Sequence, residues 1–200
     1  MRLQPRTALD ILEKIVLVGL LGSLAYRLVP SLAENPVNII FLISQVLLVA
    51  MITFRQTATR ISARGADWLV AFGGTFLPLV VRNGSGAGMG LGGVLMLVGF
   101  AVAFSSQLSL RRSLGVVAAN RGVKTSGLYG LVRHPMYLGY FLTQVGFLLA
   151  NPTGWNAAIF AIWVGCHVYR IHAEERLLSE DLDYQAFTRR VHYRLIPLVY

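Results

Sequence analysis

The chain has 200 residues, of which 55% are hydrophobic and only 14% are charged, and this composition excludes an ordinary soluble domain. A formal net charge of +9 would suit nucleic-acid binding, but the basic residues fall between apolar segments and form no basic helix or lysine-rich tail. The single cysteine, Cys166, excludes a disulfide framework and a thiolate metal cluster within the chain. We therefore predict an all-α integral membrane protein that binds no nucleic acid.

Six apolar segments follow one another along the chain and predict its membrane helices. They cover residues 15–33, 37–54, 67–81, 89–110, 137–150 and 155–169. A helix needs roughly 20 residues to cross a bilayer, so the first, second and fourth segments are long enough and the others are short. The first segment continues too far to be a cleavable signal peptide. We predict a polytopic protein with about six transmembrane helices, or five if one short segment does not cross.

The last two apolar segments are separated by a very short connection. Only the residues Asn-Pro-Thr-Gly, from Asn151 to Gly154, lie between them. Pro and Gly end one helix and begin another, so the sequence predicts a tight helical hairpin over residues 137–169.

Basic residues gather on one side of the six predicted helices. Lys and Arg accumulate in short cytoplasmic loops. Of the 18 Lys and Arg residues, only Arg27 and Arg82 fall on the opposite side. The others precede the first segment or follow the second, fourth and sixth: Arg2, Arg6, Lys14, Arg55, Arg60, Arg64, Arg111, Arg112, Arg121, Lys124, Arg133, Arg170, Arg176, Arg189, Arg190 and Arg194. Both termini, the loop over residues 111–135 and the C-terminal tail are therefore predicted to be cytoplasmic.

The glycine-rich stretch from Asn83 to Gly93 is not expected to bind phosphate, because no strand precedes it. Gly86 and Gly90, like Gly88 and Gly92, are four residues apart, which allows membrane helices to approach closely. We expect helix packing or a flexible loop here. The chain then divides into a membrane-helix region over residues 1–110 and a region of polar motifs over residues 111–200, within a single integrated membrane domain.

A first polar motif, Arg-His-Pro, stands at the start of the fifth apolar segment. Pro135 suits the first turn of a helix, which would place His134 at the N-cap. Free backbone N–H groups at such a helix end attract carboxylates. Tyr137 and the aromatic residues after it offer faces to a planar base or a cation. The alternative is a simple interfacial anchor, with Arg and Tyr at the membrane surface.

A second polar motif follows the sixth apolar segment. Arg170 and Glu174 are four residues apart and share one helix face, while Glu175 points about a quarter-turn away. An ordinary salt bridge is the alternative, but charged groups at a membrane boundary indicate function. His167 and His172 are five residues apart and lie on different faces, so no metal site is expected.

These motifs, taken in order, resemble the isoprenylcysteine carboxyl methyltransferase family, which is related to the membrane phospholipid methyltransferases. The motifs are TSGLYGLVRHPMYLGY from Thr125, Asn-Pro at Asn151, RIHAEERLL from Arg170, then DYQAF and RLIP up to Pro197. The resemblance covers about residues 121–200. The first four apolar segments match only in being membrane helices.

The resemblance implies S-adenosylmethionine as methyl donor, held where the last helices and the tail meet. It places His134, Pro135, Tyr137 and Gly139 in the cofactor pocket, and makes Glu174 a cofactor contact and Arg170 the group that faces an acceptor carboxylate. We count Glu175 with the cofactor-binding residues, and Glu175 or His172 becomes the candidate base if the acceptor is an amine. Apolar and aromatic residues in the tail fit a segment that lies along the membrane and closes the pocket.

The leading hypothesis is an integral-membrane, S-adenosylmethionine-dependent methyltransferase, the catalytic region being residues 111–200. Its acceptor would be a lipophilic molecule or lipid with a carboxylate, amine or thiol group, which enters from the bilayer. One alternative is a membrane reductase with a nicotinamide cofactor, because membrane sterol reductases have a similar C-terminal half. A non-catalytic membrane scaffold is the other alternative.

Overall fold

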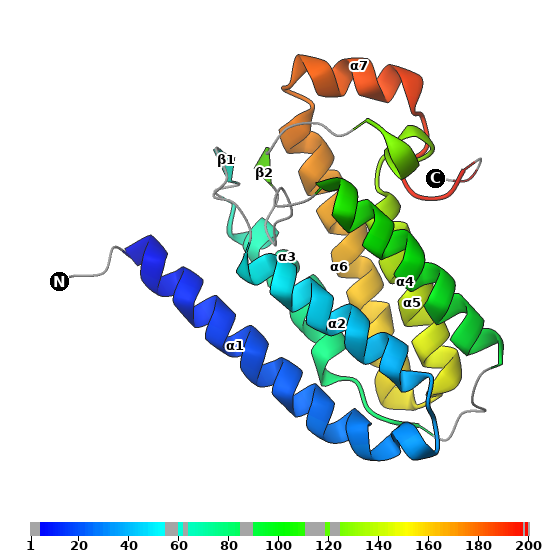
Figure 1. Ribbon diagram of the computed structural model, residues 1–200. Helices are drawn as coiled ribbons and strands as arrows, with labels where there is room; N and C mark the ends of the chain where they lie inside the picture. Colours follow the sequence, from blue (N-terminus) through cyan, green and yellow to red (C-terminus); the bar gives the residue numbers. More distant parts are fainter. Residues whose placement is uncertain are drawn as a thin grey trace.

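A computed structural model of the protein describes residues 5–54, 60–61, 64–84, 90–110, 119–120, 125–197 and 199, and gives no side chains for 5–10, 60–61, 110 and 119–120. The described residues form a helical bundle with one short strand pair (Figure 1). The α-helices are α1 (Pro5–Leu28), α2 (Asn38–Thr53), α3 (Gly65–Phe76), α4 (Leu91–Leu110), α5 (Pro135–Ala150), α6 (Gly154–Leu178) and α7 (Leu182–Arg190). Described 3-10 helices are η1 (Val29–Ala33), η2 (Leu77–Val80) and η4 (Gly127–Gly130), and the strands β1 (Arg60–Ile61) and β2 (Ala119–Asn120) pair antiparallel.

Each predicted apolar segment contains a helix, so the all-helical prediction is confirmed. Two of the described helical segments, Ile11–Ala33 and Leu91–Ser109, are long and apolar enough to cross a membrane. The apolar helices of residues 38–53, 65–80 and 135–150 are shorter. The number of crossings and the sidedness of the termini stay predictions. Several residues used for them lie outside the described ranges: Arg2, Arg55, Arg111, Arg112, Arg121, Lys124, Gly86 and Gly88.

The hairpin predicted over residues 137–169 is present, with longer arms. Helix α5 ends at Ala150, and α6 begins at Gly154 after a connection in which Thr153 Oγ1 accepts a hydrogen bond from the Asn156 backbone N–H. Such an N-cap satisfies one of the free amides of the helix start. Helix α6 continues to Leu178, so the second polar motif lies on the last turns of an unbroken helix.

Helices α4 and α5 form the most extensive helix contact in the described part of the chain, and they lie side by side in Figure 1. A Cβ atom built on Gly139 would lie 2.4 Å from the Ala103 backbone nitrogen, and one on Gly99 would lie 2.5 Å from the Thr143 backbone nitrogen. A Cβ atom on Gly92 would lie 2.8 Å from the Gly146 carbonyl oxygen. The two backbones are therefore in direct contact, which small residues permit between membrane helices.

Buried asparagines tie the connections together at the end of the bundle where α5 turns into α6. Asn151 Nδ2 donates to Asn38 Oδ1 at 2.8 Å, and Asn151 Oδ1 accepts from the Gly84 backbone N–H at 3.0 Å. Asn35 Nδ2 donates to the Ala150 carbonyl at 2.9 Å. Buried amide groups need such partners, and here they fix the hairpin against the loops before α2 and α4.

Candidate functional site: a polar cluster beside a buried cavity

The polar residues predicted as a site gather at the opposite end of the bundle. The start of α5 and the last turns of α6 lie there, beneath α7 and the C-terminal residues (Figure 1). His134 is the N-cap residue of α5 and Pro135 lies in its first turn, as the sequence predicts. No side chain caps this helix start. An uncapped helix start keeps backbone donors for an anion.

Glu175 is the centre of the polar cluster. Its carboxylate is surrounded by groups from three parts of the chain: Arg194 Nε at 2.7 Å, Arg133 Nε at 3.1 Å, His134 Nε2 at 3.3 Å and the Tyr184 hydroxyl at 3.4 Å. The contact with Arg133 is an ion pair without hydrogen-bond geometry, because Arg133 Nε has no hydrogen-bond partner. Glu175 therefore holds the tail and α7 against the start of α5.

These contacts also determine the charge of Glu175. Burial by itself would raise the pKa of this carboxyl group, but hydrogen bonds from His134 and Arg194 and the charge of Arg133 lower it to about 2. Burial and the nearby Glu175 charge raise the pKa of the Tyr184 hydroxyl, which therefore stays protonated as a donor. Glu175 is thus an anion whose partners are supplied by the protein itself.

The C-terminal tail is attached to the start of α5 through the backbone. The Arg133 N–H donates to the Tyr193 carbonyl at 2.9 Å, and the His134 N–H donates to the Arg194 carbonyl at 2.8 Å. Beneath α7, Tyr129, Tyr184, Phe187, Val191 and Leu178 form a small hydrophobic cluster. The tail therefore covers the polar cluster.

Glu174 is the less occupied of the two adjacent carboxylates. The Tyr137 hydroxyl donates a short hydrogen bond to Glu174 Oε1, and His134 Nδ1 lies 3.9 Å from Glu174 Oε2. The Glu174 side chain is 23% exposed, whereas that of Glu175 is 12% exposed. Glu174 therefore keeps room for a positively charged ligand group.

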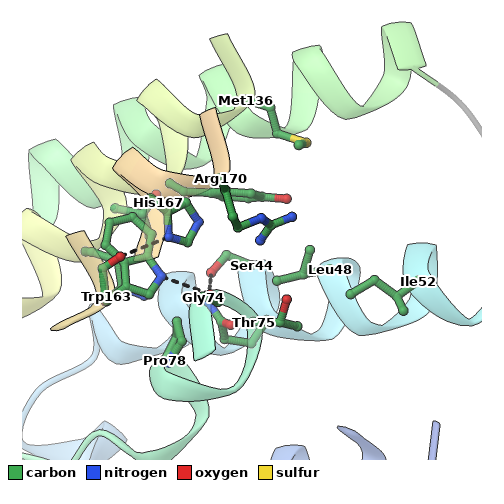
Figure 2. A pocket seen from close by; sticks show the side chains of 14 residues that line it. Ser44, Leu48, Ile52, Gly74, Thr75, Pro78, Met136, Trp163, His167 and Arg170 are labelled. Atoms are coloured by element: carbon green, nitrogen blue, oxygen red, sulfur yellow. Dashed lines mark hydrogen bonds between the residues drawn. The ribbon is translucent and has the colours of Figure 1, made fainter. Parts of the chain in front are cut away.

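Tyr137 separates the polar cluster from a buried cavity. The guanidinium carbon of Arg170 lies 5.3 Å from the centroid of the Tyr137 ring, a cation–π arrangement. The cavity holds about 500 Å³ of empty space, its mouth included, and is lined by α2, α3, η2, α5 and α6 (Figure 2).

Two polar atoms in the cavity wall are buried without hydrogen-bond partners among the described residues. They are Arg170 Nε, on a residue 8% exposed, and Gln45 Oε1, on a residue 6% exposed. One is a donor and the other an acceptor, and such orphaned groups cost free energy unless a ligand or water pairs with them. The cavity is therefore suited to a ligand that both accepts and donates hydrogen bonds.

The structure brings most of the predicted site residues together, but two lie apart. His134, Pro135, Tyr137, Arg170, Glu174 and Glu175 lie in or beside the polar cluster. Gly139 faces α4, where it permits the close approach to Ala103. His172 is exposed, and its Nδ1 lies 2.8 Å from the Val168 carbonyl oxygen.

The cavity contains residues that sequence reasoning missed. Ser44, Gln45, Gly74, Thr75 and Trp163 line it, and none of them lies in a motif. His167 also lines it. Sequence reasoning considered this residue only as a possible metal ligand, and found no second ligand at a suitable spacing. Gln45 carried a usable signal, because a polar side chain inside an apolar segment is a reason to suspect a site.

Comparison with protein families gives a match to the phospholipid methyltransferase family over residues 87–183. The match includes α4, so the expectation that the first four apolar segments resemble the family only in being membrane helices was too narrow. It also includes α5, α6 and the α5 and α6 walls of the cavity, together with Arg133, His134 and Glu175 of the polar cluster, whereas Tyr184 and Arg194 lie beyond it. The segment of residues 87–183 therefore belongs to the phospholipid methyltransferase family of membrane methyltransferases, as the resemblance of the motifs indicated.

Proposed function

We propose that the protein is an integral-membrane, S-adenosylmethionine-dependent methyltransferase of the isoprenylcysteine carboxyl methyltransferase-like kind, acting on a lipophilic acceptor. The observation that carries the proposal is the placement of two different environments on either side of Tyr137. One contains the partly free carboxylate of Glu174, and the other is a cavity in whose wall Arg170 Nε has no hydrogen-bond partner. Two substrates that must meet need two such adjoining sites.

The polar cluster fits the charges of S-adenosylmethionine. Glu174 can pair with its ammonium group, and the uncapped start of α5 can receive its carboxylate. The Tyr137 and His134 rings, with centroids 5.7 Å apart, offer aromatic surface to adenine or to the sulfonium. When bound, this cofactor supplies a methyl group on a positively charged sulfur. Glu175, which the sequence groups with these contacts, would also position His134 and the tail.

The cavity fits the acceptor. Its wall is largely apolar, and Arg170 at its upper side can orient an acceptor group toward Tyr137. Methyl transfer needs alignment of nucleophile, methyl carbon and sulfur in a dry site more than it needs covalent help from the protein. The bundle gives such an enclosure, and membrane lipids would surround it. Both termini would lie on the cytoplasmic side, where the basic residues between the helices gather.

Calorimetric titration of the detergent-purified protein with S-adenosylmethionine tests the proposal. We expect saturable binding that Glu174→Gln weakens at least tenfold, since each ion pair lost to a ligand costs on the order of 1.4 kcal/mol or more. Asp183→Asn, an exposed carboxylate on α7, is the matched control and should bind normally. Binding of reduced nicotinamide dinucleotide phosphate alone would favour the reductase, and binding of neither compound would favour a scaffold.

A further inference from the structure

His167 is a buried imidazole in the cavity wall with a defined tautomer. Its Nδ1 lies 3.1 Å from the Trp163 carbonyl oxygen, four residues earlier in α6. A carbonyl oxygen only accepts hydrogen bonds, so Nδ1 carries the proton and the neutral ring has its lone pair on Nε2. Figure 2 shows this second nitrogen on the side of the ring that faces the cavity and Arg170.

The ring is fixed in this orientation by its neighbours. Its centroid lies 3.9 Å from that of Trp163 and 5.2 Å from that of Tyr137. On the α3 side, a Cβ atom on Gly74 would lie 3.0 Å from His167 Cε1, so a side chain there would press against the ring. Among the described residues, nothing donates a hydrogen bond to His167 Nε2.

The other candidate bases are in worse positions. Glu175 is held as an anion with a pKa of about 2 by its partners in the polar cluster. His172 is exposed and is not part of the cavity wall. His167 combines a free lone pair with a place in the wall that Arg170 shares.

We propose that the cavity takes an amphiphile whose nucleophile carries a hydrogen, and that His167 Nε2 accepts this proton as the methyl group is transferred. The nucleophile is an alcohol, phenol, amine or thiol, and the ligand also carries an acceptor for Arg170. This inference rests on the proposed function and deepens it, because it restricts the acceptor class. A carboxylate acceptor would need no base.

The step balances in atoms and charge. The bond between the methyl carbon and the sulfonium sulfur breaks, and its electron pair stays on sulfur, which becomes a neutral thioether. The bond between the nucleophile and the methyl carbon forms, and the nucleophile's proton moves to His167 Nε2. One positive charge disappears at sulfur while one appears on the imidazole, so the net charge of the two sites together does not change.

The proposal is first tested by binding, without any methyl donor. Trp163 lies against His167 and should report ligands in the cavity through its fluorescence, in a Trp68→Phe/Trp155→Phe background that removes the other indoles. The probes are dodecanol, dodecylamine and dodecanethiol, each paired with its O-methyl, N,N-dimethyl or S-methyl derivative, and dodecanoate. We expect at least one protic probe to bind tenfold more tightly than its methylated partner.

His167→Phe should abolish that difference, while His172→Phe, on the exposed face of the same helix, should preserve it. Equal binding within every pair, binding of dodecanoate alone, or a difference that survives in His167→Phe would overturn the proposal. Because this assay contains no methyl donor, it separates the two ideas: absent S-adenosylmethionine binding with intact probe discrimination would reject the proposed function and keep the cavity assignment.

A second arm tests the proton transfer. With tritiated S-adenosylmethionine and the protic probe that binds, His167→Gln should lower kcat about 100-fold, the usual contribution of a general base, and leave KM within about twofold. Binding of S-adenosylmethionine should not change in this variant. Unchanged kcat, or a wild-type protein that binds both ligands and transfers no methyl group, would overturn the catalytic step.

Discussion

Helix α5 has two faces that differ in how completely they are filled. Toward α4 its backbone touches the neighbouring backbone, with Gly139 and Gly146 at positions where no larger residue fits. Toward α2, α3 and α6 it borders the cavity, which has unpaired polar atoms in its wall. The contact with α4 holds α5 in place, so the other face can leave space for a ligand without collapse.

The largest effect is expected from filling the close contact. Gly139→Ala places a Cβ atom 2.4 Å from the Ala103 backbone nitrogen, and only a shift of a whole helix relieves this clash. We expect a loss of about 3 kcal/mol of folding stability or more, measured by thermal unfolding in detergent. Gly165→Ala is the matched control, because nothing lies within 4 Å of its Cβ position. Equal melting temperatures for the two variants would show that α4 and α5 are not in contact.

The next largest effect is expected from lowering the pH, which protonates Glu175 in the polar cluster. The pKa of Glu175 is about 2 in the folded protein against 4.5 for the free group, and 2.5 units correspond to about 3 kcal/mol. Because the folded-state pKa is the lower one, this stabilisation is present above pH 4.5 and is lost as pH falls toward 2. Hydrogen exchange of the Arg133 and His134 amides, which donate to the tail, should accelerate over this range. In Glu175→Gln the amides should already exchange fast at neutral pH, and retained pH dependence would contradict this assignment.

Two arginines on α6, Arg170 and Arg176, differ in whether their side chains have hydrogen-bond partners in the protein. Arg176 donates to both carboxylate oxygens of Asp67, at 3.1 and 2.8 Å, whereas Arg170 Nε has no hydrogen-bond partner. Arg170→Met should change the free energy of unfolding by about 1 kcal/mol or less, because it removes a buried Nε donor that has no hydrogen-bond partner to lose. Methyl transfer should fall about 100-fold, since the acceptor is no longer oriented.

Arg176→Met should show the opposite balance. It leaves the buried Asp67 carboxylate with fewer donors and should cost about 1–3 kcal/mol in thermal unfolding. Binding of S-adenosylmethionine and the KM for the acceptor should change little. If Arg170→Met is the more destabilising of the two variants, Arg170 has a structural partner and is not free for a ligand.

The smallest effect is expected at the edge of the polar cluster. The Arg194 side chain is 34% exposed, so its bond to Glu175 is partly screened by water. Arg194→Gln should weaken S-adenosylmethionine binding by about two- to fivefold, equivalent to 0.4–1 kcal/mol, through a looser tail. Calorimetry of this variant beside Arg189→Gln, an exposed arginine of α7, checks the prediction. Identical affinities would mean that the tail does not contribute to the site.

Local features of the sequence were enough to place the helices, the hairpin and the start of α5. Proline at the first turn and an apolar run after it are sufficient for His134 and Pro135, because these signals act within one turn. The cavity could not be predicted in this way. Gln45 and Gly74 line the same cavity as Arg170 only because α2, α3 and α6 pack together in the folded chain. Nothing near these residues in the sequence indicates that packing.

The two adjacent glutamates show the same limit more sharply. Helix geometry separates Glu174 from Glu175 by about 100°, but it does not say which of the two carboxylates is paired with other groups of the protein. That depends on Arg194 and Tyr184, which arrive from the tail and α7. Sequence reasoning therefore grouped both residues with the cofactor contacts, whereas the structure gives them different surroundings.

The unbroken helix α6 has a further consequence. His167, Arg170 and Glu174 lie at spacings of three and four residues, so a rise of about 1.5 Å per residue fixes their separations along one axis. The helix therefore fixes the distance between the two proposed ligand sites, and this distance does not depend on the conformation of the loops. One alanine inserted after Arg170 would advance Glu174 and Glu175 by a single step and rotate them by about 100°, which would turn both carboxylates away from their partners at the start of α5 while His167 and Arg170 keep their places in the cavity wall.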